Sequence, residues 1–132
     1  MEEKRVAEYR SPDGTFTYDI SQGAGFYVLN QAGEESLADA KHLAAALQDL
    51  HRRVGNRYAL LMPLPEDFKG AKPEARKVMS DTVLTENSPL SKFAIYGGSF
   101  LLRSMFNLYT RVSKVPVRLF ATREEAEAWL KN

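Results

Sequence analysis

The chain has no cysteine and no long apolar run. Without cysteine it cannot contain a disulfide framework or a thiolate nucleophile. No apolar stretch approaches the roughly 20 residues that a transmembrane helix needs. The first residues, Met1–Arg5, lack the apolar region of a secretory signal. These absences predict a soluble cytoplasmic protein that does not insert into membranes.

Net charge is also nearly absent. The formal net charge is +1 at pH 7, which is too small to create a field that attracts nucleic acid or an anionic membrane. We therefore expect no nucleic-acid partner. The 132 residues are predicted to form one domain, residues 1–132, because a chain of this length can bury about two-thirds of its unfolded surface.

Residues that usually support catalysis or metal binding are scarce. The only two histidines, His42 and His51, have no cysteine near them, so no metal site is predicted. Glu66 and Asp67 are adjacent carboxylates without a nucleophile or a base–orienter pair. The Gly23–Gly25 turn lacks the third glycine of a dinucleotide-binding motif and precedes a strand. We expect no catalytic residues and no cofactor, and hence a protein that is not an enzyme.

The sequence does contain strand and helix patterns in a regular order. Residues 5–30 are predicted to be strands, with a hairpin around the turn Ser11–Gly14 and a third strand at Phe26–Leu29. From residue 36 to residue 132, helices and strands alternate. The first helix is predicted to start at Ser36 and to end at Gly55, a C-terminal cap.

The middle of the alternating part is the most apolar. The run Arg57–Met62 predicts the central parallel strand. A surface loop at residues 63–72 follows, and then a helix that begins at Pro73 and ends before Asn87. A further strand is predicted at Lys92–Tyr96.

The last third of the chain is predicted to hold two more helices and a strand. Ser99 is placed to cap a long helix, and a strand at Val117–Phe120 precedes a helix with a Thr122/Glu125 capping box. Trp129 is expected to be a core or edge anchor. The apolar arc of the long helix, which we expect a sheet to cover, consists of Leu101, Leu102, Met105, Phe106, Leu108, Tyr109 and Val112. The order predicts an α/β fold, with a mixed sheet of about five strands packed with about four helices.

A set of residues in the second half of the chain shares its spacing with a known family. The set comprises Tyr58–Met62, Glu74–Arg76, Ala94–Ser99, Arg103, Asn107, Arg118–Phe120, Glu125, Ala126, Trp129 and Leu130. In these segments the chain resembles small uncharacterised bacterial STAS-like proteins, relatives of the anti-sigma-factor antagonists. The resemblance covers a little over half of the chain. It implies a STAS-like fold and a regulatory role.

The resemblance also implies a phosphorylation switch. Regulatory members of the family carry a serine just after the third strand, where phosphate places negative charge in a partner interface. This chain has no serine or threonine between Tyr58 and Met79, and the first candidate, Ser80, lies inside a predicted helix. We therefore predict that the usual phosphoserine switch is missing.

Gly97, Gly98 and Ser99 form a candidate anion-binding turn between a strand and a helix. Backbone N–H groups at a helix N-terminus can hold an anion, and the Ser99 hydroxyl would add a donor. The alternative is a tight turn with an ordinary cap, because no lysine follows in a P-loop pattern.

Four residues are candidates for binding a partner. Arg103, Asn107 and Arg111, spaced four apart, lie on one face of the long helix and could contact an acidic partner. Phe68 stands among charged residues of the 63–72 loop. It is either an exposed partner anchor or tucks back onto the sheet edge.

The function predicted from these residues is regulatory binding to another protein, or to a second copy in a homodimer. The alternative is a carrier of a small ligand or lipid. Its pocket would lie beneath the helices and be lined by Met79, Met105, Phe106 and Tyr109.

Overall fold

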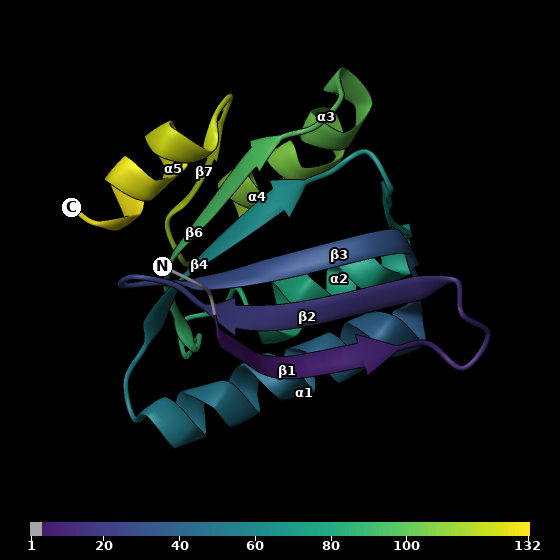
Figure 1. Ribbon diagram of the computed structural model, residues 1–132, viewed down its shortest axis with the longest axis horizontal. Coiled ribbons are helices and arrows are strands. Elements are labelled where there is room, and N and C mark those ends of the chain that lie inside the picture. Colours follow the sequence, from purple (N-terminus) through teal and green to yellow (C-terminus); the bar gives the residue numbers. More distant parts are fainter. Residues whose placement is uncertain (1–3) are drawn as a thin grey trace.

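The computed structural model describes residues 4–132 and shows one mixed sheet with helices on both faces (Figure 1). The strands are β1 (Lys4–Arg10), β2 (Phe16–Gln22), β3 (Tyr27–Glu35), β4 (Tyr58–Leu64), β5 (Phe68–Ala71), β6 (Leu90–Gly97) and β7 (Val117–Phe120). The helices are α1 (Leu37–Val54), α2 (Pro73–Thr82), α3 (Phe100–Asn107), α4 (Tyr109–Val112) and α5 (Arg123–Leu130). The strand order is β1-β2-β3-β4-β6-β7, with β5 paired to β3. The predicted α/β class with a mixed sheet is confirmed.

The N-terminal strands β1, β2 and β3 form an antiparallel meander. The turn between β1 and β2 is closed by hydrogen bonds from Gly14 N–H to Ser11 O, 3.0 Å, and from Ser11 N–H to Phe16 O, 2.9 Å. The hairpin predicted around Ser11–Gly14 is confirmed. Strand β3 is longer than the predicted Phe26–Leu29, because β2 pairs with it as far as Gly33.

Helix α1 starts and stops at the predicted caps. Ser36 and Asp39 form a capping box at its N-terminus. Gly55 has a φ of 86° and donates its N–H to His51 O at the C-terminus. The helix packs its apolar face, which includes Leu43 and Leu47, against the sheet.

Strand β4 lies at the centre of the sheet, as predicted. It pairs in parallel with β6 along its whole length and with the start of β3 on its other side. Residues 58–62 are all buried. A strand covered on both faces in this way carries a continuous apolar run.

The predicted loop at residues 63–72 was partly wrong, because it contains β5. Phe68, Gly70 and Ala71 pair in parallel with the last residues of β3. The extension of β3 beyond Leu29 supplies these backbone partners. A four-residue segment flanked by charged residues has too little local pattern to reveal such a pairing. The sheet therefore has seven strands and not about five.

The predicted long helix after Ser99 is interrupted at Leu108, which separates α3 from α4. Near the break, the hydroxyl of Thr110 donates to Asn107 O at 2.7 Å, and Arg111 N–H bonds to Leu108 O at 3.0 Å. A hydroxyl that donates to a backbone carbonyl competes with the backbone N–H group that bonds to this carbonyl in a regular helix. Apart from this break, the four predicted helices are present.

Apolar side chains are buried on both faces of the sheet. One face carries the larger cluster, in which Leu29, Leu60 and Phe93 pack beneath residues of α1 to α4. Helix α5 covers a smaller cluster on the other face, and Trp129 packs at its edge with its ring centre 5.7 Å from that of Phe120. No helix within residues 4–132 is long and apolar enough to cross a membrane.

Candidate functional site

The turn at Gly97–Ser99 lies where β4 and β6 end and α3 begins (Figure 1). Gly98 has a φ of 82°, and a Cβ atom there would lie 2.7 Å from the Cβ of Leu64. Only glycine fits such a backbone next to such a neighbour. The Ser99 hydroxyl accepts the N–H of Leu102 at 3.2 Å and so caps α3. The tight turn with an ordinary cap is therefore present, and anion binding there stays a prediction.

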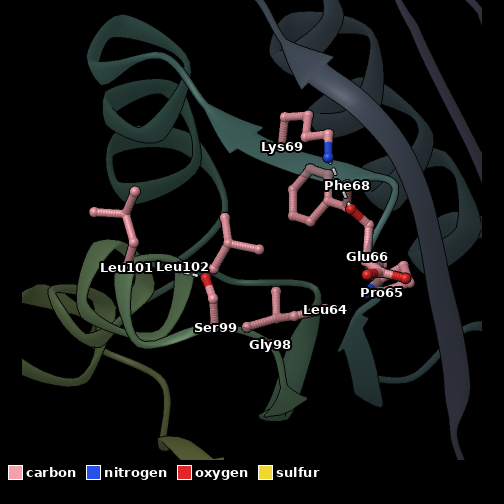
Figure 2. A pocket seen from close by; sticks show the side chains of 9 residues that line it. All are labelled: Leu64, Pro65, Glu66, Phe68, Lys69, Gly98, Ser99, Leu101 and Leu102. Carbon is pink, nitrogen blue, oxygen red and sulfur yellow. Dashed lines mark hydrogen bonds between the residues drawn. The ribbon is translucent and has the colours of Figure 1, made fainter.

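A hollow of about 500 Å³ opens beside this turn (Figure 2). Its walls come from the end of β4, the loop and strand around β5, and the first turn of α3. It is lined by Leu64, Pro65, Glu66, Phe68, Lys69, Gly98, Ser99, Leu101 and Leu102. The lining is mostly apolar, and the Lys69 ammonium is tied to the carbonyl oxygen of Glu66 at 3.0 Å. Such a hollow can accept one apolar side chain or a small ligand.

Phe68 is not the exposed anchor that was one of its two predicted roles. Its side chain is only 1% exposed, and its ring stacks on Phe106 with the centres 5.8 Å apart. The pairing of β5 with β3 turns Phe68 toward the core beneath α3. The second alternative, in which Phe68 tucks onto the sheet, is the one observed.

The apolar arc of the predicted long helix is only partly covered. Leu102, Met105, Phe106 and Tyr109 contact the core, as expected. Leu101, Leu108 and Val112 are exposed, contrary to expectation. The arc is wider than the strip of sheet beneath α3 and α4, where the nearest strands are the short β5 and β7.

Phe100, which the sequence did not single out, is the most exposed large apolar residue. Its side chain is 86% exposed and that of Leu101 is 71% exposed. Among residues 4–132, six large apolar side chains are exposed, and four of them are on this segment. We call Phe100, Leu101, Leu108 and Val112 the α3–α4 apolar surface. The sequence could have indicated this exposure, because Phe100 lies in the first turn of the predicted helix and outside its apolar arc.

The predicted Arg103/Asn107/Arg111 face contains one structural arginine. Arg103 Nη1 donates to Gly97 O at 3.2 Å and to Phe120 O at 2.7 Å, which joins the ends of β6 and β7. Asn107 and Arg111 are exposed. Partner binding by this face stays a prediction, with Arg103 already held in place by two carbonyl groups.

The residues predicted to line a carrier pocket are in the core instead. Met79, Phe106 and Tyr109 are buried, and the sulfur of half-buried Met105 lies 3.5 Å from the Ala71 N–H nitrogen. None of the four lines the hollow at Gly98. Close packing of these side chains counts against the predicted pocket beneath the helices.

A second group of polar side chains joins the hairpin to α1. The Tyr9 hydroxyl donates to Asp39 Oδ1 at 2.7 Å, and the Tyr18 hydroxyl lies 2.8 Å from His42 Nδ1. The hydrogen bond to Asp39, together with burial, raises the pKa of Tyr9 to about 12. Each contact is explained by packing of the hairpin on the helix. Within residues 4–132 no group of three or more histidine and carboxylate side chains could hold a metal ion.

Within residues 4–132, Glu35 is the one deeply buried carboxyl group that lacks a full set of partners. Its side chain is 6% exposed, and neither its Oε2 atom nor Gln31 Nε2 has a hydrogen-bond partner in the described part of the chain. Burial, with a smaller effect of the Asp39 carboxylate, raises the pKa of Glu35 to about 8. Glu35 does not line the hollow at Gly98.

Comparison with known families agrees with this geometry. Residues 27–131 match the family described as SpoIIAA-like. The chain belongs to the SpoIIAA-like family. The STAS-like resemblance noted in the sequence is thereby confirmed. A search of curated proteins found no match.

Two solved structures share the SpoIIAA-like fold of this chain. An uncharacterised protein of the DUF3478 family with a SpoIIAA-like fold, from Shewanella loihica PV-4, is 14% identical with a TM-score of 0.61. The alignment covers 98% of this chain and 96% of that one. An anti-sigma factor antagonist from Mycobacterium paratuberculosis is 16% identical with a TM-score of 0.61, over 94% of this chain and all of that one. At these identities the comparison shows the fold alone.

Proposed function

We propose that this SpoIIAA-like chain is a non-enzymatic regulatory module that binds another protein through the α3–α4 apolar surface. The observation that carries the proposal is the exposure of Phe100 and Leu101, at 86% and 71%. Leu101 lines the hollow at Gly98, and Phe100 lines a second hollow between α3 and β7. Soluble monomers seldom leave contiguous large apolar side chains in water unless a partner covers them. Aromatic and large aliphatic anchors next to a cavity are typical of protein interfaces.

The distribution of polar groups supports a binding role over a catalytic one. Tyr9 and Asp39, like Tyr18 and His42, are engaged in holding the hairpin on α1. Glu35 is buried away from the hollow. Of the polar side chains that line the hollow at Gly98, Lys69 donates to Glu66 O and Ser99 caps α3. The predicted cytoplasmic location fits such a module and stays part of the proposal.

The proposed binding is not controlled by the phosphoserine switch of regulatory relatives. The N-cap of α2 is Lys72, whose side chain makes no capping hydrogen bond. Ser80 lies near the end of the same helix and not at its start. A phosphate on Ser80 would sit far from the N-terminal turn where a helix favours negative charge.

The test is capture of partners by the tagged chain from its native lysate, followed by mass spectrometry of proteins and small molecules. The variant is the double substitution Phe100→Ser/Leu101→Ser. The matched control is Leu37→Ser/Val54→Ser, which removes two exposed apolar side chains from α1. Because Phe100 and Leu101 are mostly exposed, each of their single changes should alter folding stability by less than about 0.5 kcal/mol. Leu37 and Val54 are 39% and 37% exposed, so each control change should cost more, about 1 kcal/mol.

We expect a protein that co-purifies with the wild type and with the control but is lost with Phe100→Ser/Leu101→Ser. Circular dichroism and thermal melting would show that the variant is folded. Equal capture by both double variants would refute the proposed surface. A bound lipid or metabolite without a protein partner would favour a carrier that uses the hollow at Gly98.

A further inference from the structure

A groove runs between the exposed side of α3–α4 and strand β7, on the other side of α3 from the hollow at Gly98. Its volume is about 500 Å³. It is lined by Phe100, Arg103, Ser104, Asn107, Thr110, Val117, Arg118 and Leu119. Two arginines and no carboxylate are among these residues. Phe100 belongs both to this groove and to the α3–α4 apolar surface.

In the segment between Glu86 and Glu124, which contains all the residues that line the groove, every charged side chain is positive. No acidic residue occurs between Glu86 and Glu124, whereas six basic residues do: Lys92, Arg103, Arg111, Lys114, Arg118 and Arg123. Of these, Arg103 and Arg118 line the groove, and exposed Arg111 on the same segment forms no salt bridge within residues 4–132. Lys114 lies instead in a hollow that it shares with Asp81 and Glu86, and Lys92 donates to the carbonyl groups of Trp129 and Asn132. The near-neutral net charge of the chain conceals this local excess. A partner segment that fits the groove is therefore expected to be acidic.

Strand β7 offers a free edge to such a segment. It is the last strand in the sheet order, so within residues 4–132 it pairs only with β6. The Phe93 N–H donates to Pro116 O at 2.9 Å, and residues along a strand point their backbone groups to alternate sides. The N–H and C=O groups of Val117 and Leu119 therefore face away from β6. They are open to an added strand.

The guanidinium of Arg103 is already positioned to bind a carboxylate. Its two hydrogen bonds to Gly97 O and Phe120 O both come from Nη1. Its Nη2 and Nε atoms have no bond to a group within residues 4–132. A guanidinium that is already fixed by two backbone carbonyls loses little freedom when it binds a carboxylate.

We propose that the groove binds an acidic, extended segment of the protein partner, which pairs with the free edge of β7. This inference rests on the proposed function, because it names the chemistry of the partner that the module binds. One side of the added strand would place apolar residues against Phe100 and Leu119 and a carboxylate near Arg103. The other side would face Arg118, whose guanidinium lies over the Phe120 and Trp129 rings, 5.4 and 5.8 Å from their centres.

The charges and shape of the groove favour an extended acidic peptide over a second copy of the chain and over a membrane surface. A second copy of the chain would bring Arg118 against Arg118 in a symmetric edge pairing, which like-charge repulsion disfavours. A membrane surface is broad and has no backbone groups to offer a strand edge. An extended acidic peptide satisfies the free edge and the arginines together.

The probe is a library of short random peptides selected on the immobilised, full-length chain. We expect the selected peptides to carry net negative charge and to alternate apolar and polar residues. When such a peptide binds, hydrogen exchange at the Leu119 amide should slow by at least about tenfold, since the amide gains a partner. Affinity should fall as salt rises.

Two pairs of variants separate edge pairing from loss of folding. Leu119→Pro removes the outward N–H without touching the bonds to β6, and proline is tolerated at such an edge position. It should weaken peptide binding at least about tenfold, whereas Leu119→Val, which keeps the N–H, should bind like the wild type. Arg118→Glu should weaken binding similarly, and Arg57→Glu, on an exposed residue before β4, should leave it unchanged.

Peptides without net negative charge, or binding that Leu119→Pro leaves intact, would overturn the inference. So would the absence of any enriched peptide, or binding of anionic lipid vesicles in place of peptides. If these results coincide with partner capture that still depends on Phe100 and Leu101, the proposed function stands and only the partner chemistry is wrong. Loss of that dependence would refute the proposed function itself.

Discussion

Glu35 shows how a single buried carboxyl group can affect the whole domain. It ends β3 immediately before the capping box of α1, and its backbone carbonyl accepts the N–H of Lys72 at 3.0 Å. Its side chain is buried, and no cation within residues 4–132 offsets its charge. The neutral acid is therefore favoured in the folded protein, in contrast to most native carboxyl groups, which are stabilised as anions.

The raised pKa predicts that stability falls as pH rises. In the unfolded chain the pKa of Glu35 is near 4.5, and in the folded protein it is about 8. Between these values the folded state binds more protons than the unfolded state, so the contribution of Glu35 to the unfolding free energy decreases with pH. The loss approaches about 1.4 kcal/mol per pH unit and ends above pH 8.

Urea unfolding of the wild type and Glu35→Gln from pH 5 to pH 9 measures this effect. We expect the stability difference to shift in favour of Glu35→Gln as pH rises, because the amide is neutral throughout. Glu34→Gln, on the exposed neighbouring residue, controls for the general loss of a carboxyl group. A stability difference between wild type and Glu35→Gln that does not change with pH would contradict the prediction.

Between elements, Arg103 is the clearest example of a side chain that joins segments distant in the sequence. It extends from α3 to the carbonyl groups at the ends of β6 and β7. Gly97 belongs to the turn before α3, and Phe120 directly follows the β7 residues that line the groove. The arrangement links the position of α3 to the edge of the sheet.

Arg103→Met should destabilise the protein by about 1–2 kcal/mol, since it removes two charge-assisted hydrogen bonds from a half-exposed position. Arg111→Met, one exposed arginine further along the same segment, should change stability by less than about 0.5 kcal/mol. Chemical denaturation of both variants checks the difference. Equal stabilities would mean that the two carbonyl contacts of Arg103 are not maintained in solution.

Elements with strong local signals were predicted well, and elements that depend on distant partners were not. The caps at Ser36, Gly55 and Thr122 set their helix ends through hydrogen bonds a few residues away. Strand β5 has no such signal, because its backbone partners are contributed by β3, more than 30 residues earlier. The apolar pattern likewise did not indicate the break at Leu108, near which the Thr110 hydroxyl donates to Asn107 O.

For the whole molecule, charge distribution bears on self-association. Exposed Arg111 lies in the same segment as the α3–α4 apolar surface, and the β7 edge carries Arg118. Two copies that met through either surface would place these cations together. A partner of opposite charge is thus favoured over the homodimer that was one of the predicted partners.

We expect a monomer in sedimentation experiments at low salt. At about 1 M salt the Debye length falls to about 3 Å, so repulsion is screened and self-association through Phe100 and Leu101 should increase. Phe100→Ser/Leu101→Ser should stay monomeric under both conditions. A dimer that forms at low salt and dissociates at high salt would contradict this charge argument.

The sequence by itself determined the α/β class, the hairpin, the central strand and the capped helices. Each depends on periodicity or on residues close together in the chain, such as the Ser36–Asp39 box. For the candidate site, the sequence singled out the Gly97–Ser99 turn and the Arg103–Arg111 face, whose binding roles stay predictions. It missed the exposure of Phe100 and left two alternatives for Phe68.

Only the tertiary structure decided which apolar side chains are covered. Phe68 and Leu101 are both apolar residues near the same turn, yet Phe68 is buried by pairing with β3 and Leu101 is left in water. The free edge of β7 and the groove beside it likewise follow from strand order, which local sequence does not encode. Burial depends on the surfaces that distant segments bring together, and binding surfaces are what this assembly leaves uncovered.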